Sequence, residues 1–256
     1  MNNSDFLKKY LQFQNSVTFD ELIDLGFALI GYSKVDTSEY WNMALISEPI
    51  SDDQLEEVES FFISINRRKT FYFETKKEVV KALENKGYKK SYEDTWQFYE
   101  NSEVENKGFE FVKKVKDEND LLVFLKTIES CYQKDDPQNP YGELGDYLKV
   151  AEEGWRKHNK TDRLEYFIVY KGDKPVAVAT LNNFEGVGYI SNVGSLREVR
   201  GQGYGKIATL YCVNQSIKNG NKIHCLTTEE GAYPFEFYKR IGFVKKFSAL
   251  GYTKNI

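Results

Sequence analysis

The chain has 256 residues, of which 41% are hydrophobic and 29% are charged, and its formal net charge is −4. These values are typical of a globular protein that buries a core in one large domain or two small ones. The acidic balance disfavours nucleic acids and anionic membranes as partners, because both require a basic face. The chain has no apolar run of signal-peptide or membrane-span length, which predicts a cytoplasmic protein.

The first hundred residues predict alternating helices and strands. Helices are expected at residues 4–16, 51–68 and 76–88, where apolar side chains recur every three to four positions. Ser51 is expected to cap the second of these, and Gly87 to end the third. Strands are expected at 27–35, 40–48, 69–75 and 94–100. The polar segment 101–108 predicts a boundary between a domain of residues 1–105 and a domain of residues 106–256.

The second part predicts a strand at 109–117, helices at 118–133 and 143–159, and three strand runs between 164 and 195. A helix from 204 to 218, a strand at 222–229, a short helix at 234–243 and a final strand to 254 follow. Strands that first follow one another and then alternate with helices predict an α/β (α+β) fold, a mixed sheet with helices on its faces.

The segment "VGSLREVRGQGYGKIATLY", residues 193–211, carries the clearest chemical signal. Glycines at 201, 203 and 205 stand between a strand and a helix, with Arg200 and Lys206 beside them. The first N–H groups of a helix lack internal partners, the helix dipole adds positive charge, and glycine admits close approach of a ligand. This pattern favours a phosphate or pyrophosphate site over a plain tight turn.

Two common phosphate motifs do not fit. A P-loop needs glycine where Arg200 stands and Ser or Thr where Ile207 stands, and a dinucleotide-binding loop needs glycine where Lys206 stands. The pattern R-x-x-G-x-G, from Arg200 to Gly205, resembles instead the coenzyme A loop of the GNAT superfamily of N-acetyltransferases. A second resemblance is "FYKRIGF", where Tyr238 lies four residues before Gly242-Phe243. The resemblance covers roughly residues 108 to 256.

The resemblance implies a mostly antiparallel GNAT-type sheet and acetyl-CoA as cosubstrate. The pyrophosphate is expected on the N–H groups of residues 202–206, and the pantetheine arm along the edge of the strand that ends at 193–195. Tyr238 occupies the position of the acid that protonates the departing thiolate. The expected coenzyme-binding residues are Val193, Gly194, Ser195, Arg200, Gly201, Gln202, Gly203, Tyr204, Gly205 and Lys206.

The general base is not identified by the sequence. Glu185, Glu229 and Glu230 lie at the ends of predicted strands near the expected substrate, but they are interpreted as solvated loop carboxylates. His158 and His224 match no motif. No metal site is expected, because the three cysteines are scattered. The acceptor is predicted to be a primary amine of a small molecule or a peptide, and the protein to be a monomer or homodimer without nucleic-acid or membrane partners.

The N-terminal half shows a weak internal repeat. Residues 76–100 and 233–252 each contain a helix, a Gly-aromatic stop, a lysine pair and a strand. Leu83 stands where Tyr238 stands in the second copy, and Asp52 and Asp53 stand where a pyrophosphate loop would lie. This predicts two tandem GNAT-like domains, the first without a cofactor site; a small unrelated α/β domain is the alternative.

Three functions remain open from the sequence. The first is an N-acetyltransferase with one working site in the C-terminal half. The second is a coenzyme A-binding sensor or interaction module without turnover. The third, an aminoacyl-tRNA-dependent transferase, is suggested by the tandem arrangement but disfavoured by the acidic chain and the coenzyme A loop.

Overall fold

The computed structural model describes residues 1–255 and divides them into two compact units. The first unit contains residues 1–96, 228–230 and the described chain from residue 246 onward; the second contains 97–227 and 231–245. The sequence-based boundary at residue 105 lies nine residues beyond the division at residue 96. The last strand of the chain lies mainly in the first unit. A single boundary along the sequence therefore cannot separate the two units.

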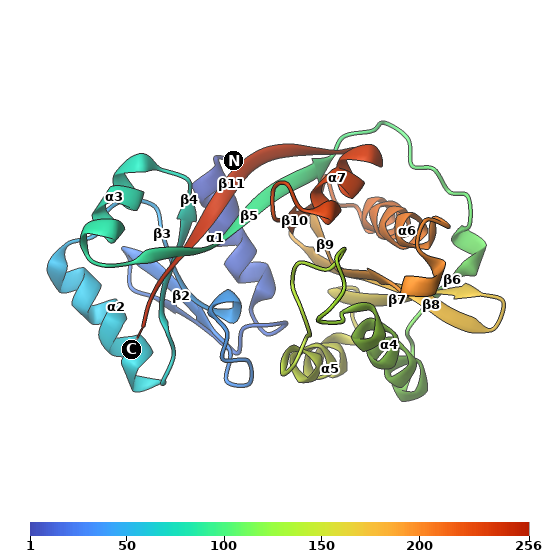
Figure 1. Ribbon diagram of the computed structural model, residues 1–256, viewed down its shortest axis with the longest axis horizontal. Helices are drawn as coiled ribbons and strands as arrows, with labels where there is room; N and C mark the ends of the chain where they lie inside the picture. Colours follow the sequence, from blue (N-terminus) through green and yellow to red (C-terminus); the bar gives the residue numbers. More distant parts are fainter. Residues whose placement is uncertain (256) are drawn as a thin grey trace. The chain divides into compact units, whose positions relative to one another are not determined.

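The first unit is a sheet with helices on both faces (Figure 1). Its strands follow the order β1-β2-β3-β4-β11-β5. The helices are α1 (Asn3–Gln14), α2 (Asp52–Ser64) and α3 (Lys77–Asn85). The strands are β1 (Glu21–Asp24), β2 (Ala28–Tyr32), β3 (Asn42–Ile46), β4 (Lys69–Glu74), β5 (Lys89–Tyr99) and β11 (Phe243–Lys254), and a 3₁₀ turn spans Glu39–Trp41.

Alternation along the strands sends side chains to opposite faces of this sheet. On β4, Phe71 and Phe73 join the core formed with α2 and α3, to which Val58 and Leu83 contribute. The intervening Tyr72 faces α1, where Tyr10 lies 6.3 Å away between ring centroids. Aromatic side chains therefore fill the α1 face, and mixed aliphatic and aromatic side chains fill the other.

The second unit contains the strand order β10-β9-β8-β7-β6. Its helices are α4 (Glu118–Cys131), α5 (Tyr147–His158), α6 (Tyr204–Lys218) and α7 (Tyr233–Arg240). Its strands are β6 (Val112–Lys114), β7 (Leu164–Lys171), β8 (Lys174–Phe184), β9 (Val187–Ser195) and β10 (Ile223–Thr228), with 3₁₀ turns at Phe109–Phe111 and Arg197–Val199.

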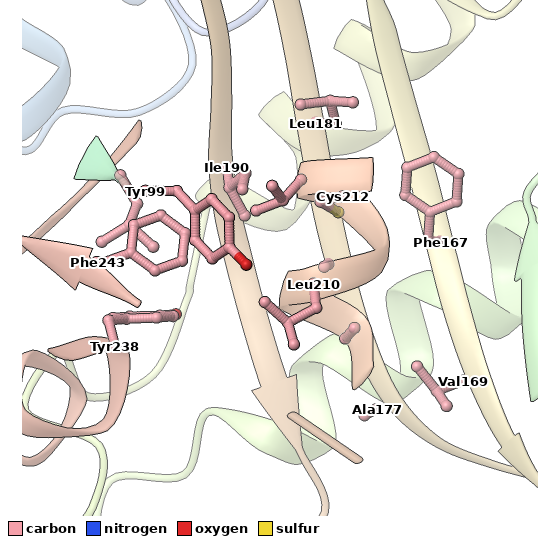
Figure 2. Packing of buried hydrophobic residues seen from close by; sticks show 14 residues of the cluster. Tyr99, Phe167, Val169, Ala177, Leu181, Ile190, Leu210, Cys212, Tyr238 and Phe243 are labelled. Atoms are coloured by element: carbon pink, nitrogen blue, oxygen red, sulfur yellow. The ribbon is translucent and has the colours of Figure 1, made fainter. Parts of the chain in front are cut away.

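The two faces of this sheet carry different helices. Phe167 of β7 packs in a core with residues of α6 and α7, which Figure 2 shows from close by. The next residue back, Tyr166, points to the opposite face, where its ring stacks on Phe124 of α4 and its hydroxyl donates to the Ala151 carbonyl of α5 over 2.7 Å. Helices α6 and α7 therefore pack on one face of this sheet, and α4 and α5 pack on the other.

Each unit contains a parallel β-α-β crossover. Strands β3 and β4 pair in parallel and are joined by α2, and β9 and β10 pair in parallel and are joined by α6. The order helix, positive-φ glycine, strand also recurs: α3, Gly87 (φ 84°) and β5 in one case, α7, Gly242 (φ 110°) and β11 in the other. The recurrence supports the repeat predicted from the sequence.

The predicted fold class, a mixed and mostly antiparallel sheet flanked by helices, is confirmed. Two details differ. Strand β1 at Glu21–Asp24 was not predicted, because four residues give too short a pattern. Residues 109–111 form a 3₁₀ turn before the strand expected to begin there. Among the described helices, none has the length and apolarity needed to cross a membrane.

Candidate functional site

A cavity of about 310 Å³ opens in the second unit at the start of α6. Four segments line it: the end of β9, the loop that leads into α6, helix α7, and the segment that follows α4. Nine of the ten predicted coenzyme-binding residues lie in this lining, and the tenth lies in the same loop outside it. The lining members of the prediction are Val193, Gly194, Ser195, Arg200, Gly201, Gly203, Tyr204, Gly205 and Lys206.

Gln202 is the predicted residue outside the lining. Its backbone N–H donates to the Val199 carbonyl over 3.2 Å, so it is not available to a ligand as the resemblance implied. Its exposed side chain accepts a hydrogen bond from Lys171 Nζ over 2.9 Å. The N–H of Gln202 closes the turn, and its side chain lies outside the cavity.

The loop presents unpaired backbone donors to the cavity. The N–H groups of Gly201, Gly203, Tyr204, Gly205 and Lys206 have no acceptor among the described residues. Gly203 is the N-cap of α6 and has φ of 90°, a conformation that glycine adopts without strain. It provides no capping side chain. The helix therefore begins with open donors and the positive end of its dipole directed at the cavity.

Arg200 is held by a carboxylate that the sequence did not identify. Its guanidinium forms two hydrogen bonds and an ion pair with Asp136, whose side chain is 2% exposed. The hydrogen bonds from Arg200 lower the pKa of Asp136, and Asp136 raises the pKa of Arg200. Asp136 lies in the proline-containing segment 134–142, so Arg200 ties that segment to the loop. The positive charge of Arg200 is therefore largely offset by Asp136 before any ligand binds.

The end of β9 departs from regular pairing. Parallel pairing with β10 covers residues 187–189 of β9, and the register with β8 shifts between Val178 and Thr180. Asn192 has φ of 53°, and its side chain donates to Thr180 Oγ1 over 3.2 Å. The strand therefore bends at a bulge before residues 193–195 reach the cavity. This leaves their β10-side edge open, as expected for pairing with an extended arm.

Gly194 fits where no other residue does. A Cβ placed there would lie 2.6 Å from Cys131 Cβ of α4. The neighbouring Tyr132 hydroxyl donates to the Val193 carbonyl over 3.2 Å. The end of α4 therefore fixes the bent segment of β9 from one side, a contact that the sequence motif did not indicate.

Tyr238 lines the cavity from α7 and is 7% exposed. Its ring makes edge contacts with Phe237 and Phe243, at centroid distances of 5.0 and 5.7 Å. Figure 2 shows Tyr238 beside Phe243 and Tyr99 at one side of the core. Its hydroxyl has no hydrogen-bond partner among the described residues. Burial raises the pKa of Tyr238 well above that of an ordinary phenol, so the hydroxyl keeps its proton at neutral pH.

None of the other titratable candidates lines the cavity. Glu185 lies in the β8–β9 turn with φ of 45°, and Glu229 and Glu230 belong to the first unit. His224 Nδ1 lies 2.7 Å from Ser216 Oγ, and burial lowers the pKa of His224. The described lining contains no Asp, Glu or His. No three potential metal ligands gather within residues 1–255.

Comparison with known families identifies the second unit. Residues 124–243 match the family model described as Acetyltransferase (GNAT) family. This part of the chain is a GNAT domain. The match begins within α4 and ends at Phe243, so it contains the whole cavity lining. No functionally curated protein matches the chain significantly.

Solved structures extend the likeness to the whole chain. A GCN5-related N-acetyltransferase from Kribbella flavida superimposes with a TM-score of 0.69 at 17% identity, over 99% of this chain and 96% of its own. A conserved protein of unknown function from Staphylococcus epidermidis gives 0.63 at 14%, over 94% and 96%. A tandem GNAT protein from the clavulanic acid biosynthesis pathway gives 0.56 at 10%, over 89% and 78%. At these identities the likeness concerns the fold, and it includes the N-terminal half.

Proposed function

We propose that the protein transfers an acetyl group from acetyl-CoA to a primary amine, with one coenzyme site in the GNAT domain. The observation that carries the proposal is the start of α6: Gly201 and residues 203–206, whose N–H groups are unpaired, line the same cavity as Tyr238, whose hydroxyl is unpaired. An anion seat and a proton donor in one cavity are what thioester cleavage requires.

The basic residues of the cavity support an anionic ligand. Lys206 Nζ lies 2.6 Å from Glu105 Oε2, and Arg200 pairs with Asp136, so both charges are partly offset. Arg240 also lines the cavity and forms no ion pair among the described residues; its guanidinium carbon lies 5.9 Å from the ring centroid of Tyr233. We assign the coenzyme's phosphate groups to the open N–H groups and to Arg240.

Acetyl-CoA supplies the activated acetyl thioester. In the transfer, the bond between the amine nitrogen and the carbonyl carbon forms, and the carbon–sulfur bond breaks. Tyr238 holds its proton at Oη and donates it to the departing sulfur. The raised pKa of Tyr238 keeps this proton in place across the physiological pH range.

A covalent acetyl-enzyme is disfavoured. Cys131 is the cysteine in the cavity lining, and burial raises its pKa to about 12. A thiol with that pKa is almost entirely protonated at neutral pH and is a poor nucleophile. Direct attack by the amine therefore fits the cavity better than a two-step exchange.

The lack of a general base in the described cavity lining also fits the alternative function, a coenzyme A-binding protein without turnover. No carboxylate or histidine among the described residues lines the cavity, so the proton of the amine leaves to water or before binding. The same observation suits a protein that binds coenzyme A without turnover. Thiol release from acetyl-CoA, measured with a panel of primary amines, separates the two: release above the hydrolysis background with any amine supports the enzyme.

A pair of glycine variants tests the coenzyme site itself. Gly203 and Gly220 have φ of 90° and 82°, flank opposite ends of α6, and both have open space where a Cβ would be. Gly203→Val and Gly220→Val therefore impose similar backbone strain. Calorimetry should show loss of acetyl-CoA affinity in Gly203→Val alone. Equal affinities in the two folded variants would overturn the proposed pyrophosphate seat.

A further inference from the structure

A carboxylate in the first unit lacks a cationic partner. Asp94 of β5 is partly buried on the α1 face of the sheet, and its Oδ2 accepts a hydrogen bond from the Tyr72 hydroxyl over 2.9 Å. Trp96 Nε1 donates to the same Tyr72 oxygen over 3.2 Å. The other oxygen of Asp94, Oδ1, accepts no hydrogen bond, and Asp94 forms no ion pair among the described residues.

Two neighbouring carboxylates of the first unit, Glu39 and Glu93, have hydrogen-bond donors as partners. Glu39 accepts from Arg68 and from Ser91, and Glu93 accepts from Lys90. Asp94 has only a neutral phenol as partner. Burial raises its pKa to about 6, which reflects the same lack of compensation. A buried charge without a counterion is unfavourable unless a ligand provides one.

Three tyrosines are associated with this carboxylate: Tyr72 donates a hydrogen bond to it, and its charge acts on the phenols of Tyr40 and Tyr92. The ring of Tyr92 stacks on that of Tyr72 with a centroid distance of 6.0 Å, and the ring of Tyr40 lies 4.6 Å from that of Tyr92. Gly251 of β11 permits this arrangement, because a Cβ there would lie 2.1 Å from Tyr92 Cε1. Tyr40 is 47% exposed. The cluster is therefore aromatic, negatively charged and open to solvent on the Tyr40 side.

We propose that Asp94, Tyr40 and Tyr92 form a binding site for a primary alkylammonium group. The faces of aromatic rings attract cations, and a carboxylate provides the charge-assisted hydrogen bond that an ammonium donor requires. Burial raises the pKa of Tyr40, and the charges of Glu39, Asp94 and Glu229 raise it further, so the local potential is negative and repels anions. A metal ion is disfavoured because the described residues provide no group of three ligands.

The site does not depend on the acetyl-transfer proposal, because binding is measured without acetyl-CoA. The probes are n-butylammonium, a small amine, and Nα-acetyl-lysine methylamide, which represents a peptide side chain; 1-butanol is the neutral control. Calorimetry with the full chain should show binding of one or both ammonium probes and none of the alcohol. The stronger probe identifies the source of the amine. No binding of either ammonium probe at millimolar concentrations near neutral pH would overturn the proposal.

Two charge-neutralising variants localise the site. Asp94→Asn retains an acceptor for Tyr72 and removes the charge, and it should weaken ammonium binding by about tenfold or more, the equivalent of one charge-assisted hydrogen bond. Glu93→Gln makes the same change one residue away, on the opposite face of β5, and should leave affinity within about twofold. Equal affinity of Asp94→Asn and the wild type would overturn the proposal, as would an equal loss in Glu93→Gln.

The pH dependence provides a readout that a purely structural role would not give. Wild-type affinity should increase from about pH 5 to about pH 7.5 as Asp94 ionises. The groups that face Asp94 or lie near it are the phenols of Tyr40, Tyr72 and Tyr92, neutral throughout this range, and the carboxylates of Glu39, Glu93 and Glu229. The increase should disappear in Asp94→Asn. An unchanged pH profile in that variant would place the binding elsewhere.

Discussion

Helices α2 and α6 occupy equivalent places in the two units, each within a parallel β-α-β crossover, yet their first turns differ completely. Ser51 caps α2 in a capping box with Gln54, and Asp52 and Asp53 add negative charge to the first turn. Helix α6 begins at Gly203 with no capping side chain and no acidic residue. One helix start is closed by its own side chains, and the other is left open.

The first turn of α2 is built for stability, and the first turn of α6 is suited to binding a ligand. A capped first turn satisfies its own donors and interacts favourably with the helix dipole. An open first turn leaves that stabilisation to a ligand. The shared fold therefore does not imply two coenzyme sites, and we propose that the first unit has none. The following variants test that reading.

The largest effect is expected when α6 is given the charge found in α2. Gly205 has a helical conformation, and a Cβ there would make only ordinary contacts at 3.8 Å to Phe237 and Ser195. Gly205→Asp should therefore fold, with some gain from the helix dipole. It should reduce acetyl-CoA affinity by about 100-fold or more, since the carboxylate repels the pyrophosphate and occupies its donors.

The neutral control for that variant is Gly205→Asn, which has nearly the same shape. Calorimetry should show a clearly smaller loss for asparagine than for aspartate. Identical losses would mean that bulk, and not charge, governs this position.

Tyr238→Phe should reduce kcat by about 100-fold while acetyl-CoA affinity changes little, because only the hydroxyl is removed. The loss should appear equally in kcat/KM, since proton donation occurs in the transition state. Its control is Tyr211→Phe, the same change on α6 in the same core, where the ring packs on Phe109 and Phe167 outside the cavity lining. Wild-type kcat in Tyr238→Phe, with chemistry rate-limiting, would remove the acid role.

The direction in which activity changes with pH also tests the role of Tyr238. Because the pKa of Tyr238 is raised, its ionisation should not cause a fall in activity below about pH 10. Activity should rise with pH as the amine loses its proton, and Tyr238→Phe should retain that shape at lower height. A falling limb near pH 8, present in the wild type and absent in the variant, would contradict the assignment.

A smaller effect is expected for Asp136→Asn, which leaves Arg200 without its charged partner. Acetyl-CoA affinity should change several-fold, and the free energy of unfolding should fall by about 2 kcal/mol, below the full value for a deeply buried pair because Arg200 remains 18% exposed. The lowered pKa of Asp136 means that this stability is present above about pH 4 and is lost as pH falls through the folded-state value. Unchanged stability at neutral pH would show that the pair does not hold the segment.

Motifs with local meaning were predictable from the sequence. The positive-φ glycines at 201 and 203, the helix that follows them and Tyr238 were located because their chemistry depends on neighbours a few residues away. The capping box of α2 was foreseen only as its Ser51 cap. Such features need no knowledge of distant contacts.

Features that join distant segments were not predictable. Asp136 meets Arg200 across 64 residues, and the residues of β11 pair with β4 although some 180 residues separate them. The Gln202 N–H was expected to be free, but it donates to the Val199 carbonyl. The sequence motif does not indicate this turn. Asp94 and Tyr72 become partners only when their strands lie in one sheet.

The smallest expected effect concerns the closed helix. Ser51→Ala removes the side-chain acceptor for the Gln54 N–H and leaves the rest of the turn intact. The free energy of unfolding should fall by about 1 kcal/mol, the usual contribution of a capping side chain, as measured by urea denaturation. Acetyl-CoA affinity should remain unchanged, because the first turn of α2 binds no ligand in this reading. A Ser51→Ala variant that folds normally but binds acetyl-CoA more weakly would place part of the coenzyme site in the first unit. The contrast between the two helix starts would then be one of degree.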